Sequence, residues 1–233
     1  MKSIMLYLCI LILVSQVCSY PPISAQIVQP TRKLPLIESK TLNNNGYYVI
    51  LLTGNGGWRK LVQSLTRYLN SKNVSVLALN TKQYLLSEKK PVQIACDLEN
   101  LINRYDSKWG QEKVVFLGYS MGAEVLPFAV NSMNDKYREK IQDLILIGPW
   151  QKATFKIKLA DYFYEVNKGA DIYTELMKMN NINAYIICDD NDISICHKNL
   201  DGVVDHDMLA GGHHFGGDYI SLSKMVGNRL HLE

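Results

Sequence analysis

The segment from Val114 to Val130 constrains the fold of this chain more than any other part of the sequence. An apolar run, VVFL, leads into Gly-Tyr-Ser-Met-Gly at residues 118–122 and then into an apolar stretch with helical spacing. In this order of strand, tight turn and helix, backbone packs closely on both sides of the serine, and glycine avoids the clashes at the flanking positions. The segment therefore predicts that Ser120 projects from the carboxyl end of a strand and acts as a nucleophile.

Apolar strands and amphipathic helices alternate along the rest of the chain. Continuous apolar or β-branched runs predict buried strands at 47–52, 74–79, 114–117, 144–147 and 185–187. Apolar residues at helical spacing predict helices at 58–69, 91–105, 121–130 and 219–230. Strands that are apolar throughout imply a parallel sheet with both faces covered. We expect an α/β fold, with a mostly parallel central sheet between two layers of helices.

Length and composition fit one globular domain. The chain has 233 residues, of which 47% are hydrophobic and 20% charged, and its formal net charge is +3. Basic and acidic residues are interspersed, so we expect no nucleic-acid partner. We assign residues 20–45 to an extended lead-in with one strand near 33–38, and residues 46–233 to a single domain. Between Gln151 and Asn181 the alternation breaks, which predicts a small insertion over the carboxyl edge of the sheet that shapes a substrate cleft.

The first nineteen residues are typical of a secretory signal peptide. Lys2 precedes an apolar run from Ile4 to Val14, which is shorter than the ~20 residues that a membrane-spanning helix needs. Val17 and Ser19 occupy the −3 and −1 positions for cleavage after Ser19. We therefore predict export with removal of residues 1–19. The alternative is an N-terminus that stays uncleaved and anchors the protein in the inner membrane.

Export would place the cysteines in an oxidising compartment. Cys188 and Cys196 lie close in sequence and are the expected disulfide. The chain has no Cys-X-X-Cys motif, and its histidines cluster away from these cysteines, which is not the spacing of a zinc site. We expect neither a metal nor a cofactor.

A serine at its ordinary pKa needs a general base, and the base needs a carboxylate to orient it. In a strand–serine–helix architecture the acid and then the histidine follow the serine along the chain. Gly211-Gly212-His213-His214-Phe215 places two histidines on a glycine-rich loop before the last predicted helix. We favour His214 as the base, with His213 as the alternative.

Three aspartates follow the predicted strand at 185–187 and compete for the role of the acid. Asp192 is favoured because it precedes a short apolar turn, and Asp190 is its alternative. For Asp189 we expect a turn or capping role. A disulfide between Cys188 and Cys196 would restrain the loop that carries all three.

Two backbone N–H groups are expected to stabilise the oxyanion of an acyl-transfer reaction. Met121 begins the helix after the nucleophile, so its N–H is the first donor. The glycine-rich loop from Leu52 to Trp58 follows the first predicted strand, and Asn55 is the expected second donor. This loop lacks the Gly-Lys-Ser/Thr ending of a phosphate-binding P-loop, so we reject that interpretation.

Three motifs together resemble the bacterial virulence protein VirJ family, which includes the AcvB proteins: LTGNGGW at 52–58, GYSMGAEVLPF at 118–128 and GGHHFGGDY at 211–219. The resemblance implies an α/β-hydrolase fold, a periplasmic location and a triad of Ser120, Asp192 and His214 by position. AcvB-type members hydrolyse lysyl-phosphatidylglycerol, and VirJ-type members are linked to type IV secretion. The sequence departs from the family pattern at Asn55 and Glu124, where aspartate is usual.

This resemblance implies a periplasmic serine hydrolase that removes lysine from an aminoacylated phospholipid, with contact to the membrane surface. Glu124 or Asp190 would bind the lysyl ammonium groups, although a first-turn acid such as Glu124 also complements a helix dipole without any ligand. Trp58, Phe155 and Phe215 would present apolar surface to the lipid. The alternatives are an accessory protein that contacts type IV secretion components, and a generic carboxylesterase for soluble esters.

Overall fold

The computed structural model describes residues 33–43, 45–157, 169–191 and 193–232. All helices and strands discussed below belong to the compact unit Lys33–Glu233. Within the described residues, no helix combines the length and the apolar character needed to cross a bilayer.

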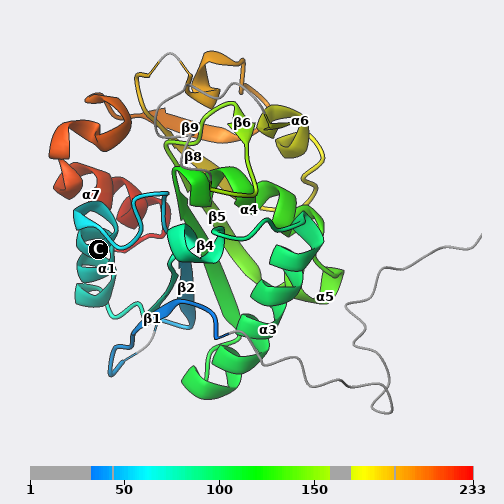
Figure 1. Cartoon of the computed structure of the whole chain (residues 1–233). Helices are drawn as coiled ribbons and strands as arrows, with labels where there is room; N and C mark the ends of the chain where they lie inside the picture. Colours follow the sequence, from blue (N-terminus) through cyan, green and yellow to red (C-terminus); the bar gives the residue numbers. More distant parts are fainter. Residues whose placement is uncertain (1–32, 44, 158–168, 192, 233) are drawn as a thin grey trace, which may run out of the picture. The chain divides into compact units, whose positions relative to one another are not determined.

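A seven-stranded sheet in the order β1-β3-β2-β4-β5-β8-β9 runs through the centre of this unit (Figure 1). Neighbouring strands are parallel, except that β1 runs antiparallel to β3. The bounds of the strands are Leu36–Ser39 (β1), Tyr47–Leu52 (β2), Val76–Leu79 (β3), Lys113–Tyr119 (β4), Ile141–Ile147 (β5), Ala184–Cys188 (β8) and Asp205–Met208 (β9).

Helices cover both faces of the sheet (Figure 1). One face carries α1 (Lys60–Ser71) and α7 (Tyr219–Arg229), which pack against each other. The other carries α3 (Pro91–Trp109), α4 (Met121–Asn131) and the short α6 (Ile172–Leu176). Single-turn helices α2 (Thr81–Tyr84) and α5 (Asp135–Arg138) join these elements, and two 3₁₀ segments lie at Ile195–His197 and Gly212–Gly217.

The buried strand β2 explains why both faces need cover. All six of its residues are buried. Tyr48, Ile50 and Leu52 belong to the core beneath α3 and α4, whereas the alternating residues belong to the core beneath α1 and α7. Because side chains alternate across a strand, an apolar run without polar gaps requires an apolar layer on each side. The three-layer α/β architecture agrees with the sequence prediction.

The two edge strands differ from the sequence prediction: β1 lies outside the predicted domain, and β9 is not among the predicted strands. β1 falls within the segment assigned to the lead-in, close to the strand predicted near 33–38, and extends the sheet at one edge. β9 was not predicted, because its residues Asp-His-Asp-Met are all exposed and lack an apolar pattern. β9 is a strand because its backbone pairs with β8, and its amino-acid composition does not indicate this.

The predicted insertion is present, and its described part packs beside α4. Strands β6 (Lys152–Ala153) and β7 (Ala170–Asp171) pair antiparallel at its base. Phe155 makes an edge-to-face contact with Phe128 at 5.3 Å, and its carbonyl oxygen accepts from the N–H of Lys89.

Candidate active site

Ser120 occupies a sharp turn between β4 and α4. Its φ of 53° and ψ of −125° lie in a region that side-chain-bearing residues rarely adopt. A Cβ on Gly118 would collide with the backbone of Ala123, and one on Gly122 would collide with the carbonyl oxygen of Leu52. The two glycines therefore let α4 approach β4 and β2 closely enough to hold the serine in this turn, as the motif predicts.

A continuous series of hydrogen bonds joins Ser120, His213 and Asp189. Nε2 of His213 lies 2.8 Å from Ser120 Oγ, and Nδ1 lies 2.8 Å from Asp189 Oδ2. With a proton on Nδ1, the imidazole donates to the carboxylate and accepts from the hydroxyl. Ser120 is 6% exposed and Asp189 is fully buried, so the arrangement is largely shielded from water. It has the geometry of a nucleophile, a base and an orienting acid.

His213 therefore takes the position for which the sequence analysis favoured His214. The exposed His214 instead lies with Nδ1 2.8 Å from the hydroxyl oxygen of Tyr119. That hydroxyl donates to the carbonyl oxygen of His213 at 3.0 Å, so it holds both histidines of the loop. The preference for His214 is corrected, because the imidazole of His213 lies within hydrogen-bond distance of Ser120 Oγ and that of His214 contacts Tyr119 instead.

Asp189 replaces the favoured aspartates as the partner of the imidazole. It directly follows β8, and the N–H of Asn191 donates to its Oδ1 at 3.1 Å, which leaves Oδ2 for His213. Asp190 is exposed and accepts from the N–H groups of Gly211 and Gly212 at 3.3 and 2.5 Å. These bonds lower the pKa of the Asp190 carboxyl and brace the histidine loop. Asp192, the favoured acid, lies outside the described residues.

Residues that the sequence analysis did not single out complete the surroundings of His213. The ring of Tyr119 stacks on the imidazole at 5.6 Å, and the ring of Trp150 lies 5.3 Å from it. Gly148 has a φ of 54°, and a Cβ there would lie 3.1 Å from Asp189 Oδ2. Gly148 and Trp150 follow β5, the neighbour of β4 in the sheet. A signal existed in the sequence, since Gly-Pro-Trp interrupts the chain directly after a predicted strand.

The expected oxyanion donors lie beside the nucleophile. Met121 is the first residue of α4, so its N–H has no acceptor within the helix. The glycine-rich loop approaches from the other side, because a Cβ on Gly54 would lie 3.1 Å from Ser120 Cβ. Asn55 follows Gly54 in this loop and lines the same pocket as Ser120.

A pocket of about 340 Å³ opens over Ser120. Its walls are the glycine-rich loop, the first turn of α1, Tyr119, the two histidines and Tyr219. Trp58 is half-buried against the core beneath α1 and α7, and Phe215 is 1% exposed within that core. Neither belongs to the pocket walls, and no described residue of the insertion does. The lipid-facing role expected for Trp58 and Phe215 thus has no support from their positions.

Glu124 is buried within α4 rather than exposed to the pocket. Its side chain is 5% exposed and accepts a hydrogen bond from the backbone N–H of Trp150. Burial raises the pKa of the carboxyl to about 8, against a smaller lowering by this hydrogen bond. Because neither Glu124 nor Asp190 lines the pocket, we do not assign ammonium recognition to either residue.

A disulfide restrains the loop that carries Asp189. Cys188, the last residue of β8, is bonded to Cys196 in the following 3₁₀ segment, which confirms the predicted pair. Within the described ranges, no group of three or more His, Cys, Asp or Glu side chains is arranged to hold a metal ion.

Comparison with solved structures identifies the fold. The chain is similar to a lipase-esterase related protein from Clostridium acetobutylicum, at 12% identity and a TM-score of 0.58, over 84% of this chain and 98% of the other. It is similar to MenH from S. aureus, at 12% identity and a TM-score of 0.62, over 84% and 97% of the two chains. A third relative is MGS-MChE2, an alpha/beta hydrolase enzyme from a lagoon-sediment metagenome, at 18% identity and a TM-score of 0.57, over 83% and 92%.

These likenesses show that the described unit has the α/β-hydrolase fold, as the sequence resemblance implied. A comparison with curated proteins finds no match. The family model described as bacterial virulence protein (VirJ) matches residues 47–233, a range that contains the serine turn, the histidine loop and all strands from β2 onward. The chain therefore belongs to the VirJ family of bacterial virulence proteins.

Proposed function

We propose that the protein is a serine hydrolase of carboxylic esters in which Ser120 is the nucleophile, His213 the general base and Asp189 the orienting acid. The observation that carries this proposal is the pair of 2.8 Å contacts that join the three side chains beneath the pocket. A buried carboxylate that accepts from Nδ1–H holds the neutral imidazole in the tautomer whose Nε2 can take a proton.

The proposed reaction has two acyl-transfer steps. Ser120 Oγ attacks the ester carbonyl while its proton moves to His213 Nε2, and the resulting oxyanion accepts from the N–H of Met121 and the N–H of Asn55. His213 then gives the proton to the departing alcohol oxygen, which leaves an acyl group on Ser120. A water molecule attacks that acyl group and transfers a proton to His213, which returns the proton to Ser120 Oγ as the bond between the acyl group and Oγ breaks and the carboxylic acid leaves.

We propose lysyl-phosphatidylglycerol as the substrate, because the chain belongs to the VirJ family, whose AcvB-type members the sequence resemblance links to this lipid. Removal of lysine from the glycerol headgroup cleaves an aminoacyl ester. This cleavage is within reach of acyl transfer through serine and requires no cofactor or metal. The substrate would be presented at a membrane surface.

Lysine release from vesicles tests the proposal. Purified protein that begins at Tyr20 should release lysine from vesicles that contain lysyl-phosphatidylglycerol, and Ser120→Ala should abolish the release. Hydrolysis of p-nitrophenyl acetate without any release from vesicles would favour the generic carboxylesterase. If Ser120→Ala left turnover unchanged, the serine mechanism would be rejected, and binding to type IV secretion components would become the function to test.

We further propose that the protein acts in the periplasm after cleavage behind Ser19. The apolar N-terminal run and the disulfide between Cys188 and Cys196 both suit an oxidising compartment outside the cytoplasm. Fractionation of cells that produce the full chain, with the mass of the released protein, distinguishes a cleaved periplasmic form from one anchored in the inner membrane.

A further inference from the structure

The pocket over Ser120 carries positive charge without compensating acids. Arg59 and Lys60 both belong to its walls, and no aspartate or glutamate among the described residues does. Both side chains are exposed. None of the ion pairs formed within the described part of the chain involves either residue. The two cations are therefore available to an anion that enters the pocket.

The side chain of Arg59 is held to the loop that lines the pocket with Ser120. Its Nε donates to the carbonyl oxygen of Gly56 at 3.3 Å, which ties the guanidinium to the glycine-rich loop. The same loop packs against Ser120 through Gly54. A guanidinium held through Nε still has two NH₂ groups, which together match the spacing of two oxygens of a phosphate. The loop thus links the serine to a cation whose free donors suit an oxyanion.

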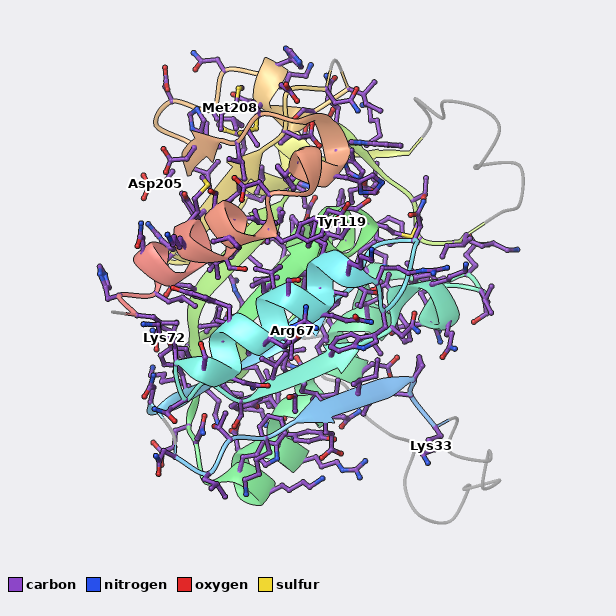
Figure 2. The ribbon with its side chains drawn as sticks, turned by 90° about the vertical axis from the view of Figure 1, so that its left-hand side faces the viewer. Lys33, Arg67, Lys72, Tyr119, Asp205 and Met208 are labelled. Atoms are coloured by element: carbon purple, nitrogen blue, oxygen red, sulfur yellow. A yellow bond between two sulfur atoms is a disulfide. The ribbon has the colours of Figure 1, made fainter. Side chains whose placement is uncertain are left out.

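Figure 2 shows α1 extending from the neighbourhood of Tyr119 to Lys72 at its opposite end. Lys60 begins this helix, and the pocket walls include Lys60 together with Tyr119. The first turn of α1 holds no acidic residue, and Arg59 provides no side-chain cap. The helix dipole therefore adds to the positive potential that the two side chains already create at the pocket.

We propose that Arg59 and Lys60 form a subsite for a phosphate group that the substrate carries close to its ester bond. The identity of the ester step rests on the proposed function. The subsite would favour glycerol esters that bear a phosphate over neutral esters of the same size. In lysyl-phosphatidylglycerol, the phosphodiester and the aminoacyl ester share one glycerol unit, so the subsite would receive the headgroup phosphate while the ester carbonyl faces Ser120.

A matched pair of soluble esters tests this subsite. 1-Acetylglycerol and 1-acetylglycerol 3-phosphate share the scissile ester and differ in the phosphate. The wild type should hydrolyse the phosphorylated ester with the higher kcat/KM. Arg59→Gln combined with Lys60→Gln should lower the ratio of the two kcat/KM values by about tenfold or more, the effect of losing a hydrogen-bonded charge pair.

Lys72→Gln is the matched control, because it removes a half-buried lysine from the other end of the same helix. This variant should keep the wild-type ratio. Release of lysine from lysyl-phosphatidylglycerol vesicles then distinguishes the sources of the phosphate. A loss in the double variant on vesicles as well as on the soluble ester indicates a lipid headgroup, and a loss on the soluble ester alone indicates a soluble phosphate ester.

Binding separates failure of the subsite from failure of the proposed chemistry. Calorimetry with Ser120→Ala protein and glycerol 3-phosphate measures the subsite without turnover. We expect the added substitutions Arg59→Gln and Lys60→Gln to weaken binding by about tenfold or more, with no change for Lys72→Gln. Equal affinities in all three proteins, or an unchanged kcat/KM ratio, would overturn the subsite. Turnover that survives Ser120→Ala would instead overturn the serine mechanism.

Discussion

His213 is held on several sides before any substrate arrives. Asp189 accepts a hydrogen bond from Nδ1 of the imidazole, and the Tyr119 hydroxyl donates to the backbone carbonyl oxygen of His213. The rings of Tyr119 and Trp150 lie within 6 Å of the imidazole. A base restrained in this way loses little entropy when it receives the serine proton. The neighbouring His214 has a different task, since its Nδ1 meets the Tyr119 hydroxyl.

We predict that the two histidines respond very differently to substitution. His213→Ala should lower kcat by about 10³-fold or more, because Ser120 loses its proton acceptor. His214→Ala removes a contact with Tyr119 but no proton-transfer group, so the loss should stay within about tenfold. Hydrolysis of p-nitrophenyl acetate measures both variants. A greater loss for His214→Ala would reverse the assignment.

The histidine loop was predictable from the sequence, but the ring that faces Ser120 was not. The backbone has positive φ at Gly211, Gly212, Phe215 and Gly216, and these turns decide where each side chain of the loop points. Residue order carries little information about such dihedrals when four glycines flank two histidines. The position of Asp189 beside the imidazole was missed for a related reason. An aspartate directly after a strand is typical of a turn, and only the folded structure brings Gly148 and His213 next to its carboxylate.

Glu124 adds a further ionisable group near the site, although it does not line the pocket. Its carboxyl is buried and its pKa is raised to about 8 by the loss of solvation. Trp150 donates a backbone N–H to it, and Trp150 also contacts the ring of His213. The proton on Glu124 is therefore linked to the stability of the segment that supports the base.

The raised pKa predicts a pH-dependent loss of stability. The folded protein binds the Glu124 proton more tightly than the unfolded chain, whose carboxyl has the ordinary pKa of 4.5. Stability from this group is present at low pH and falls as pH rises from about 4.5 to about 8. Glu124→Gln keeps an acceptor for the N–H of Trp150 and removes this loss. The unfolding free energy of the variant relative to the wild type should therefore rise by a few kcal/mol as pH increases from 5 to 8.

Denaturant unfolding at pH 5 and pH 8 checks this expectation, and Glu112→Gln, a change at an exposed glutamate, is the matched control. If the difference in unfolding free energy between wild type and Glu124→Gln were the same at both pH values, Glu124 would not carry the linked proton.

At the scale of secondary structure, burial decides which elements can be predicted from the sequence. The central strands β2, β4 and β5 are buried on both faces, and each was predicted from its apolar run. β9 pairs through its backbone alone, with four exposed side chains, so no hydrophobic pattern marks it. The insertion was located by the break in alternation, but its described part contacts α4 rather than the pocket, because Phe155 packs on Phe128.

Two glycines lie where α4 approaches β2 and where α7 approaches α1, and we predict different costs for substituting them. A Cβ on Gly122 would meet the carbonyl oxygens of Leu52 and Thr53, whereas a Cβ on Gly227 would meet the hydroxyl end of the Tyr68 side chain. Backbone at the end of β2 has little freedom to move, but a tyrosine ring can shift. Gly122→Ala should cost about 3 kcal/mol or more, and Gly227→Ala about 1 kcal/mol.

Chemical denaturation of both variants measures these costs. Labelling of Ser120 by a fluorophosphonate adds a second readout, since displacement of α4 should slow labelling in Gly122→Ala and leave Gly227→Ala near the wild-type rate. Equal costs for the two variants would contradict the closeness of α4 and β2.

At the scale of the whole molecule, the sheet gathers distant parts of the chain at one edge. Ser120 follows β4, Gly148 follows β5 and Asp189 follows β8, three neighbouring parallel strands. Their carboxyl ends meet because the strands are parallel, and the two helical layers keep the strands in that order. The histidine loop then needs only to reach this edge from the segment before α7. The position of the site is thus a property of the architecture, whereas its chemistry depends on a few side chains.

The disulfide between Cys188 and Cys196 links the stability of this architecture to the redox conditions around the protein. It closes a loop of sequence separation 8 that includes Asp189. Removal of a constraint on a loop of this length should cost about 2–3 kcal/mol. Cys196→Ser should therefore lower the Tm by roughly 4–12 °C under oxidising conditions. In a reductant strong enough to open the bridge, the Tm values of wild type and variant should converge, because both chains then lack the constraint. A difference of the same size that persisted in reductant would mean that the serine disturbs packing and that the bridge itself contributes little to stability.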